Sequence, residues 1–317
     1  MSAILWRHRA EYAVVVSVRA LVGVLPAFAG GWIGAAVGLL FYAVDGSHRR
    51  LTIDQLHVAF PTRSVNECRV IARRTFMHFG RLLVAALRAS TQTPAAFLDS
   101  VDVEGEEQVR AALAAGHGAI IFSGHYGYWE LHGLAHALVL SPMSVLARPL
   151  DNPYLHTLLE QMRRATGNNV IYRQGALRKV LRALKHNECV AMLIDQHIQG
   201  ADAVNVEFFG RPAATTTALA SLALRTGARL VPAFAIPLPN GRCRLVYEPA
   251  VDLPRPGAAD PVRELTQRCT DVLEMYVRRD PHLWLWMHRR WRERPETGPH
   301  AAGMFPVAAD ESESTER

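Results

Sequence analysis

The sequence predicts an α/β domain with a mixed, largely parallel central sheet flanked by helices, preceded by an N-terminal hydrophobic membrane helix. From about residue 100 to residue 250, short apolar runs alternate with longer segments of helical periodicity. Such alternation is typical of strands joined by crossover helices, which form parallel sheets, and it is also compatible with an antiparallel edge. The membrane helix is indicated by residues 20–44, which carry no charge, because ~20 apolar residues suffice to cross a bilayer as a helix.

The uncharged run ALVGVLPAFAGGWIGAAVGLLFYAV reads as a membrane anchor within an N-terminal segment of residues 1–48. Pro26 and the pair Gly30-Gly31 weaken or kink a helix, so a re-entrant or interfacial helix is also consistent with the run. A buried helical hairpin of a soluble protein is the remaining alternative. Arginines are denser after the run than before it, and the positive-inside tendency then favours a cytoplasmic location for the domain that follows.

The regular elements follow from the spacing of apolar residues. Residues 64–90 have helical spacing beside several arginines, which predicts a long helix. Short apolar runs predict strands at 118–123, 143–148, 169–173, 189–195, 229–236 and 243–249. The remaining periodic segments predict helices at 127–140, 152–166, 176–186, 214–227 and 261–279. We expect one domain over residues 49–294 and a polar, acidic, disordered tail over residues 295–317.

The composition limits the function classes. Half of the 317 residues are hydrophobic and a fifth are charged, which excludes a disordered chain. The net charge of +6 suits an anionic partner, such as a membrane surface, an acidic carrier protein or nucleic acid. The 4 cysteines are far apart and form no CxxC pair, so neither a disulfide framework nor a thiolate zinc site is indicated, and a reducing compartment is expected.

The stretch IIFSGHYGYWELHGLAH, residues 120–136, contains the chemically most suggestive residues. His132 and His136 are four apart and share one face of a predicted helix, a spacing that can bind zinc. Zinc needs a third ligand, Glu130 lies on another side of the helix, and the motif HExxH is absent. We therefore favour packing or surface roles for these two histidines over a zinc hydrolase.

His125 and Glu130 form an H-x4-E motif that has a different context. His125 follows a predicted strand, where a side chain can be presented at the carboxyl edge of a sheet. Glu130 falls in the first turn of the next helix, where the helix dipole favours its ionised form. The bend between strand and helix can bring the carboxylate to the imidazole, which would orient it as a general base. The spacing alone is equally compatible with a structural role.

Several ordered blocks resemble one protein family. They are RRLTIDQLHVAFP (49–61), HYGYWE (125–130), IDQHIQGADAVNVEFFGRPAATTTALASLALRTGARLVPAF (194–234) and LWMHRRW (285–291). Together with the apolar N-terminal segment they resemble the bacterial lipid A lauroyl and myristoyl acyltransferases over about residues 10–294. The resemblance implies a glycerolipid acyltransferase-like fold at the cytoplasmic face of the cell inner membrane. The same superfamily also acylates phosphatidylinositol mannosides and other membrane glycolipids, which is an alternative activity.

The resemblance implies a mechanism on the H-x4-E motif. His125 would remove a proton from an acceptor hydroxyl, and Glu130 would orient and charge-balance the imidazole. The oxygen would attack an acyl thioester of acyl carrier protein or coenzyme A directly. The sequence is consistent with direct attack, because it has no G-x-S-x-G elbow and no cysteine near His125. No metal or organic cofactor is implied, and the expected partners are the acyl donor, a lipid or glycolipid acceptor and the membrane.

Further substrate-binding candidates lie downstream of the motif. Arg148 ends a predicted strand and offers a planar fork of donors that suits phosphate, although a surface ion pair is also consistent with it. Asp195 and Gln196 end another strand and are expected at the same edge, or simply in a turn. We also expect substrate contacts from residues preceding and starting a small-residue helix, namely Gly210, Arg211 and Thr215.

The aromatic segment PHLWLWMHRRWRERP has two interpretations. Its tryptophans and arginines suit a membrane interface, but at least one of the tryptophans Trp284, Trp286 and Trp291 is expected in the core. A basic and aromatic composition also suits single-stranded nucleic acid, yet no recognition motif accompanies it, so no nucleic acid is expected as a partner. A non-catalytic lipid-binding protein stays possible, although the presence of both His125 and Glu130 argues against it.

Overall fold

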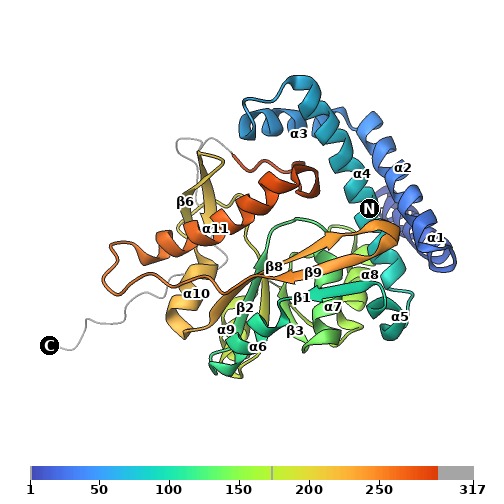
Figure 1. Cartoon of the computed structure of the whole chain (residues 1–317). Helices are drawn as coiled ribbons and strands as arrows, with labels where there is room; N and C mark the ends of the chain where they lie inside the picture. Colours follow the sequence, from blue (N-terminus) through green and yellow to red (C-terminus); the bar gives the residue numbers. More distant parts are fainter. Residues whose placement is uncertain (1, 173, 292–317) are drawn as a thin grey trace.

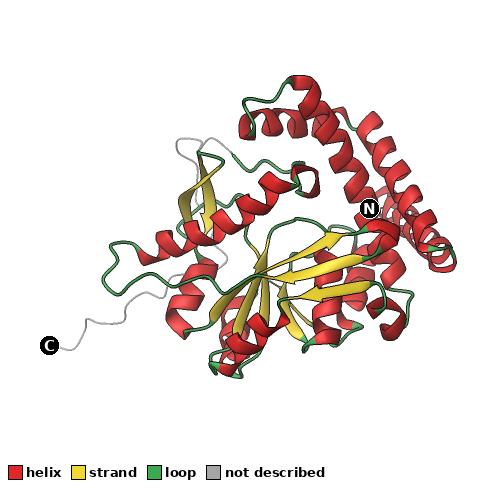
Figure 2. Cartoon of the chain, viewed as in Figure 1, coloured by secondary structure: helices red, strands yellow, loops and turns green. Residues whose placement is uncertain are grey.

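The computed structural model describes residues 2–172 and 174–291, which form an α/β fold with a largely parallel sheet between helices (Figures 1 and 2). The sheet has the order β1-β9-β8-β2-β5-β3-β4. All neighbouring strands are parallel except β8 and β9. The bounds are β1 Val101–Glu104, β2 Ala119–Ser123, β3 Met143–Leu146, β4 Asn169–Ile171, β5 Cys189–Leu193, β8 Arg229–Pro237 and β9 Cys243–Tyr247. The predicted fold class and each predicted strand are thus confirmed, and β1 was not predicted.

Helices cover both faces of the sheet because its central strands are apolar on both sides. Along β2, Ile120 and Phe122 face one part of the core, while Ala119 and Ile121 face the other. The first part is closed by α9 (Ala176–Lys185), α10 (Ala218–Thr226) and α11 (Pro261–Arg279). The second part is closed by α4 (Val65–Ala89), α6 (Glu106–Ala114) and α7 (Trp129–Val139), with α5 (Pro94–Leu98) and α8 (Pro153–Arg164) at its margin.

The N-terminal region is a set of helices and not a single anchor helix. The apolar run is interrupted at Pro26, because proline has no backbone N–H to donate to a helical hydrogen bond. α1 therefore spans Ser2–Val24, and α2 spans Ala27–Val44. α3 (Gly46–Ala59) then leads to α4, whose start is closed by a capping box between Ser64 and Glu67. Among the described helices, only α2 is long and apolar enough to cross a membrane by length and composition.

The helix expected over residues 214–227 begins later than predicted. Residues Arg211–Thr216 form β7, which pairs antiparallel with β6 (Ala203–Phe208) in a separate hairpin (Figure 2). Ala213 and Thr215 are buried whereas Ala214 and Thr216 are partly exposed, the period of two that a strand requires. The turn-forming Phe209 and Gly210 both have positive φ, which closes the hairpin. The expected tail over residues 295–317 lies outside the described residues.

Candidate active site

His125 and Asp195 lie side by side at the carboxyl edge of the sheet. β2 and β5 are neighbours, with Ser123 opposite Leu193, so the residues two positions further on come together. His125 Nδ1 lies 2.8 Å from Asp195 Oδ1, and the His125 amide donates to Asp195 Oδ2 over 2.7 Å. Because Nδ1 faces a carboxylate, the proton of a neutral imidazole sits there, and Nε2 is left as the basic nitrogen.

Asp195 is fixed by contacts from the aromatic C-terminal segment. Its side chain is fully buried, and the indole of Trp284 donates from Nε1 to Oδ2 over 2.8 Å. His288 Nε2 lies 3.0 Å from the backbone oxygen of Asp195. A carboxylate that accepts this many hydrogen bonds has one permitted orientation, so it holds the imidazole of His125 in one orientation as well.

The electrostatics favour a charged His125 next to an ionised Asp195. Burial alone would lower the pKa of His125, but the charge of Asp195 and its hydrogen bond outweigh burial and raise that pKa. Burial also opposes ionisation of Asp195, yet the adjacent His125 holds the pKa of this carboxyl well below its usual range. The imidazole therefore gains affinity for a proton while its partner stays anionic, which is the electrostatic requirement of a general base.

The turn that carries His125 is held from three sides. Leu285 donates its amide to the His125 carbonyl, and Gly127 donates its amide to the Leu283 carbonyl. His78 of α4 contacts the Gly127 carbonyl through Nε2 at 3.1 Å. Gly127 has φ +60, and a Cβ there would lie 2.1 Å from the carbonyl oxygen of Ala235, so only glycine fits. The position of His125 is thus determined by β8, α4 and the C-terminal segment together.

Glu130 differs from the expectation that it would hydrogen-bond His125. Its carboxylate forms a two-pronged ion pair with Arg163 of α8, with Nε to Oε2 at 3.0 Å and Nη2 to Oε1 at 2.5 Å. Both side chains are about four-fifths buried. Asp195 takes the place expected for Glu130, because it follows the strand directly beside β2. The charge of Glu130 still contributes to the raised pKa of His125, while that of Arg163 opposes it.

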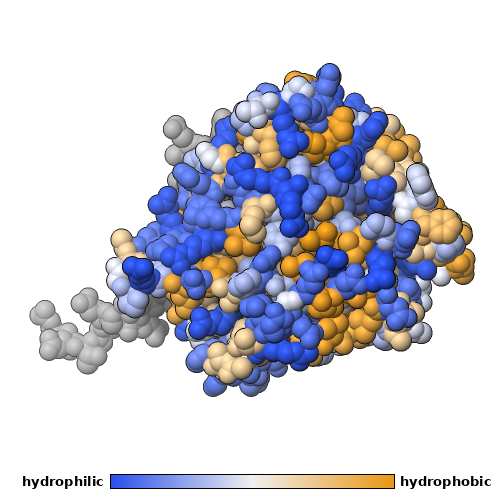
Figure 3. Space-filling model, in the orientation of Figure 1, coloured by the Kyte–Doolittle hydropathy of each residue, from blue (hydrophilic) through white to orange (hydrophobic). Residues whose placement is uncertain are grey.

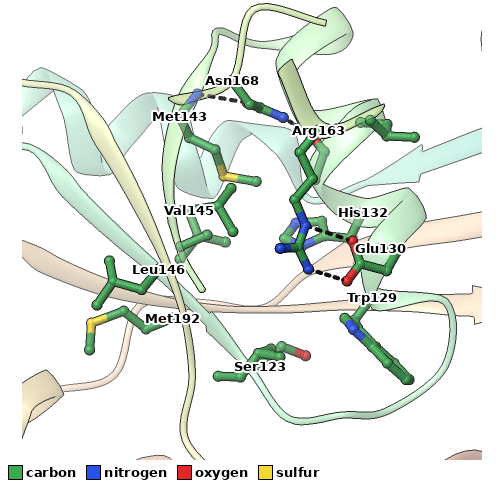
Figure 4. A pocket seen from close by; sticks show the side chains of 15 residues that line it. Ser123, Trp129, Glu130, His132, Met143, Val145, Leu146, Arg163, Asn168 and Met192 are labelled. Carbon is green, nitrogen blue, oxygen red and sulfur yellow. Dashed lines mark hydrogen bonds and ion pairs between the residues drawn. The ribbon is translucent and has the colours of Figure 1, made fainter. Parts of the chain in front are cut away.

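An apolar pocket lies between the sheet and helices α7 and α8 (Figure 4). Alternate residues of neighbouring strands line it, namely Ile121 and Ser123 of β2, Met143 and Val145 of β3, and Ala191 and Leu193 of β5. Trp129 also lines the pocket, and its ring lies edge-on to His125 with 5.3 Å between the ring centroids. The Glu130–Arg163 pair forms its polar wall in Figure 4. Through Trp129 the pocket therefore borders the imidazole of His125.

The other substrate-binding candidates occupy several places. Arg148 is exposed in the loop after β3, and Gln196 is exposed directly after Asp195, so both lie beyond the carboxyl ends of their strands. Gly210 and Arg211 are exposed at the turn between β6 and β7, in the separate hairpin. Thr215 is fully buried and accepts a hydrogen bond from Arg290 over 2.5 Å, so its hydroxyl has a structural role.

The remaining histidines and tryptophans pack in the interior. His132 and His136 lie on the buried face of α7, and His136 Nδ1 lies 2.8 Å from the hydroxyl of Tyr247. Burial lowers the pKa of His132 to about 4, so this residue is neutral. Trp284 and Trp286 are fully buried, which agrees with the core role expected for at least one tryptophan. No group of metal-ligating side chains is found among the described residues.

Sequence reasoning missed Arg163, Trp284 and His288 as parts of this site. Arg163 stands in the last turn of α8, where a basic residue also complements the helix dipole, so its sequence position carried no catalytic signal. Trp284 was weighed only as a core or membrane-interface residue. The signal available for it was local, since a polar indole nitrogen buried in a core needs an acceptor.

The sequence of this chain is similar to those of several known proteins. A family described as bacterial lipid A biosynthesis acyltransferase matches residues 3–293 of the chain. The chain is 26% identical to the lipid A biosynthesis lauroyltransferase of Escherichia coli, covering 84% of this chain and 86% of that protein. It is 27% identical to a lipid A biosynthesis acyltransferase of Haemophilus influenzae, covering 83% and 84%. A phosphatidylinositol mannoside acyltransferase of Mycobacterium tuberculosis is 28% identical over 61% of this chain and 60% of its own length.

Proposed function

The chain belongs to the bacterial lipid A biosynthesis acyltransferase family, and on that premise we propose that His125 is the general base of its acyl transfer. Membership makes the protein an acyltransferase, with an acyl donor and a lipid acceptor. We propose acyl carrier protein or coenzyme A as the donor and a lipid A precursor as the acceptor, at the cytoplasmic face of the inner membrane. The hydrogen bond between His125 Nδ1 and Asp195 carries the proposal, because it leaves Nε2 as the base.

The proposed reaction is a direct transfer. His125 Nε2 removes the proton of the acceptor hydroxyl as its oxygen attacks the thioester carbonyl carbon. The new carbon–oxygen bond forms, the carbon–sulfur bond breaks, and the imidazolium returns its proton to the departing thiolate. The products are an ester and a free thiol. Asp195 stabilises the imidazolium during the step, and the pocket beside Trp129 holds the acyl chain.

Arg163 and Glu130 are proposed to form the polar mouth of the acyl pocket. We assign Glu130 as a positioning residue that acts through Arg163, since the two share a largely buried, two-pronged ion pair. Arg148 and Gln196, exposed at the same sheet edge, are proposed to contact the charged head of a substrate. We do not extend this role to Gly210 and Arg211, which remain predictions from the sequence alone.

The direct test of the function is an assay of the purified protein in detergent. A lauroyl thioester of acyl carrier protein or of coenzyme A is offered with either a lipid A precursor or a phosphatidylinositol mannoside, and products are read by mass spectrometry. We expect one acyl group to be added to the lipid A precursor, with release of the thiol. Acylation of the mannoside alone would favour the second activity that the mycobacterial relatives suggest. No ester product from either acceptor, with a folded protein, would refute acyl transfer to a glycolipid.

Removing either partner of the Glu130–Arg163 ion pair should reduce activity, and the two losses should not add because both substitutions break the same interaction. We expect Glu130→Gln and Arg163→Gln each to lower kcat/KM by ~10-fold or more, because each leaves a partly buried group without its partner. The double variant should be no worse than the more damaging single variant, since the two residues act as a unit. The matched control is the double variant Glu160→Gln with Arg164→Gln. It removes another ion pair of α8, in which Arg164 is more exposed than Arg163. Additive losses would contradict the pairing.

Narrowing the pocket should shorten the acyl chain that is transferred. A Cβ on Gly133 would lie 3.8 Å from Met143 Cε, an ordinary contact, so larger residues extend from α7 into the pocket without backbone strain. The variant is offered a mixture of acyl thioesters of different chain lengths. We expect Gly133→Leu to transfer shorter acyl chains than the parent does, with about fourfold discrimination against a chain for each methylene that the pocket excludes. Gly133→Ala is the control and should shorten the transferred chain less. An unchanged chain distribution in Gly133→Leu would place the acyl chain elsewhere.

A further inference from the structure

Helix α2 presents an apolar surface that nothing in the described chain covers. The helix has no charged residue, and its large side chains Phe28, Trp32, Leu40, Phe41 and Val44 are more than half exposed. α1 adds Trp6, Val14 and Val24 to this exposed apolar surface. Apolar residues gather on this side of the molecule in Figure 3, where α1 and α2 run in Figure 1. A surface of this kind marks contact with a membrane or a partner.

The opposite face of α2 is fixed along α4. Gly34, Gly38 and Gly80 bring the two backbones into direct contact. A Cβ on Gly80 would lie 2.0 Å from the Gly34 oxygen, and one on Gly38 would lie 2.1 Å from the Phe76 oxygen. The turn before α2 is fixed to α4 too, because Arg88 donates to the carbonyl of Val22 over 2.8 Å and to that of Leu25. The two helices are therefore held together, and wherever α2 lies at a membrane, α4 lies directly against it.

α4 cannot enter the hydrocarbon core of a bilayer. Its exposed face carries Glu67, Arg69, Arg73 and Arg74, and Arg81 lies further along it. An arginine at the centre of a membrane-spanning helix is strongly disfavoured, and several along one helix exclude insertion. A spanning α2 would have to leave α4 and expose its glycine stripe to lipid. The packing of α2 on α4 thus argues against a spanning anchor, although its length alone permits one.

The charge around this surface suits an anionic bilayer. Residues 1–90 contain many more arginines than acidic residues. The arginines are Arg7, Arg9, Arg19, Arg49, Arg50, Arg63, Arg69, Arg73, Arg74, Arg81 and Arg88, against Glu11, Asp45, Asp54 and Glu67. Basic residues beside an apolar helix face are attracted to anionic lipid head groups and hold the helix in the plane of the interface.

We propose that α1 and α2 form an interfacial anchor that lies in the head-group region of an anionic lipid bilayer and does not cross it. The apolar face of α2 enters one leaflet, α4 lies behind it on the aqueous side, and the arginines of α1 and α3 contact lipid phosphates. This proposal refines the membrane location within the proposed function. Its test does not depend on catalysis, so the two can fail separately.

The depth of one residue distinguishes the two modes of anchoring. Ala36 is exposed and lies near the middle of α2, and the native cysteines are all buried, so Ala36→Cys accepts a spin label selectively. The labelled full chain is bound to vesicles of phosphatidylethanolamine and phosphatidylglycerol, and depth is measured from the accessibility of the label to oxygen and to a nickel chelate. We expect a depth of ~5–10 Å below the head groups. A depth of ~15 Å, half of the hydrocarbon core, would show a spanning helix and overturn the proposal.

Two controls complete this experiment. A label on Arg73→Cys, on the exposed face of α4, should remain accessible to the nickel chelate at the level of an aqueous site. The double variant Phe28→Ser with Trp32→Ser should bind the same vesicles at least ~10-fold more weakly, because it removes two large apolar side chains from the docking face. Its activity on detergent-dispersed substrate should be unchanged. Vesicle binding equal to that of the parent chain would also overturn the proposed docking face.

Discussion

Replacing His125 with alanine should lower kcat by about 10²–10⁴-fold, the range that a general base contributes. The loss follows from the geometry, because His125 Nδ1 is committed to Asp195, which leaves Nε2 as the basic nitrogen, and Trp129 of the pocket lies edge-on to the imidazole. Turnover of a lauroyl thioester with a glycolipid acceptor measures the effect. We expect the affinity for the substrates to change little, since the acceptor proton is removed only in the reacting state.

The control for this variant is His57→Ala, the same substitution at an exposed histidine of α3. Both variants should keep the far-ultraviolet circular dichroism of the parent. The thermal midpoint of His125→Ala should fall, because the substitution leaves the fully buried Asp195 carboxylate without its imidazole partner, so it is assayed well below that midpoint. A folded His125→Ala protein that transfers acyl chains at nearly the parent rate would contradict a base at this position.

Replacing Asp195 with asparagine should lower kcat by about 10²-fold or more while preserving the side-chain shape. The substitution removes the negative charge that raises the pKa of His125 and the acceptor pair that orients its ring. An asparagine amide group can still accept from Trp284, but it cannot accept from all of the present donors. A rate within threefold of the parent would remove Asp195 from the mechanism and leave its hydrogen bonds as packing.

A fall in stability accompanies the second substitution and must be separated from the catalytic effect. Asp195 is fully buried and receives several hydrogen bonds, so the asparagine leaves at least one buried donor unsatisfied, at a cost of ~1–3 kcal/mol. Assays at a temperature well below the measured thermal midpoint remove this contribution. Conservation of the near-ultraviolet tryptophan signal verifies that Trp284 still packs in the core.

The fold and the position of His125 could be predicted because they depend on local patterns. The apolar runs gave the strands, and a histidine two residues after a buried strand lies at the carboxyl edge in any parallel sheet. The family resemblance seen in the motif blocks is also confirmed, by a match over residues 3–293. Asp195 was placed at the same edge for the same reason, but its hydrogen bond to His125 was not predicted. That contact depends on β5 lying beside β2, and strand order is a property of the whole sheet.

Contacts distant in sequence account for the other differences. Glu130 was paired with His125 by closeness in the chain, whereas its partner Arg163 comes from the end of the next helix. Thr215 was placed at a helix start because small residues follow it, and its burial in a hairpin depends on Arg290, from the C-terminal segment. The division of the apolar run into α1 and α2 followed from Pro26, which the sequence indicated, but the packing of α2 on α4 required the structure.

The pH dependence of kcat/KM in the parent and in Asp195→Asn is the most direct test of the His125–Asp195 pair as general base. The base must be neutral to accept a proton, so kcat/KM should rise with pH through the raised pKa of His125. In Asp195→Asn the carboxylate that raises the pKa of His125 is gone, while the burial that lowers this pKa remains. The rise of kcat/KM with pH should therefore move below pH 6.5, the ordinary pKa of histidine. The plateau that kcat/KM of Asp195→Asn reaches at high pH should be lower than the plateau of the parent. An acidic limb at the same pH in both proteins would contradict the pairing of His125 with Asp195 in catalysis.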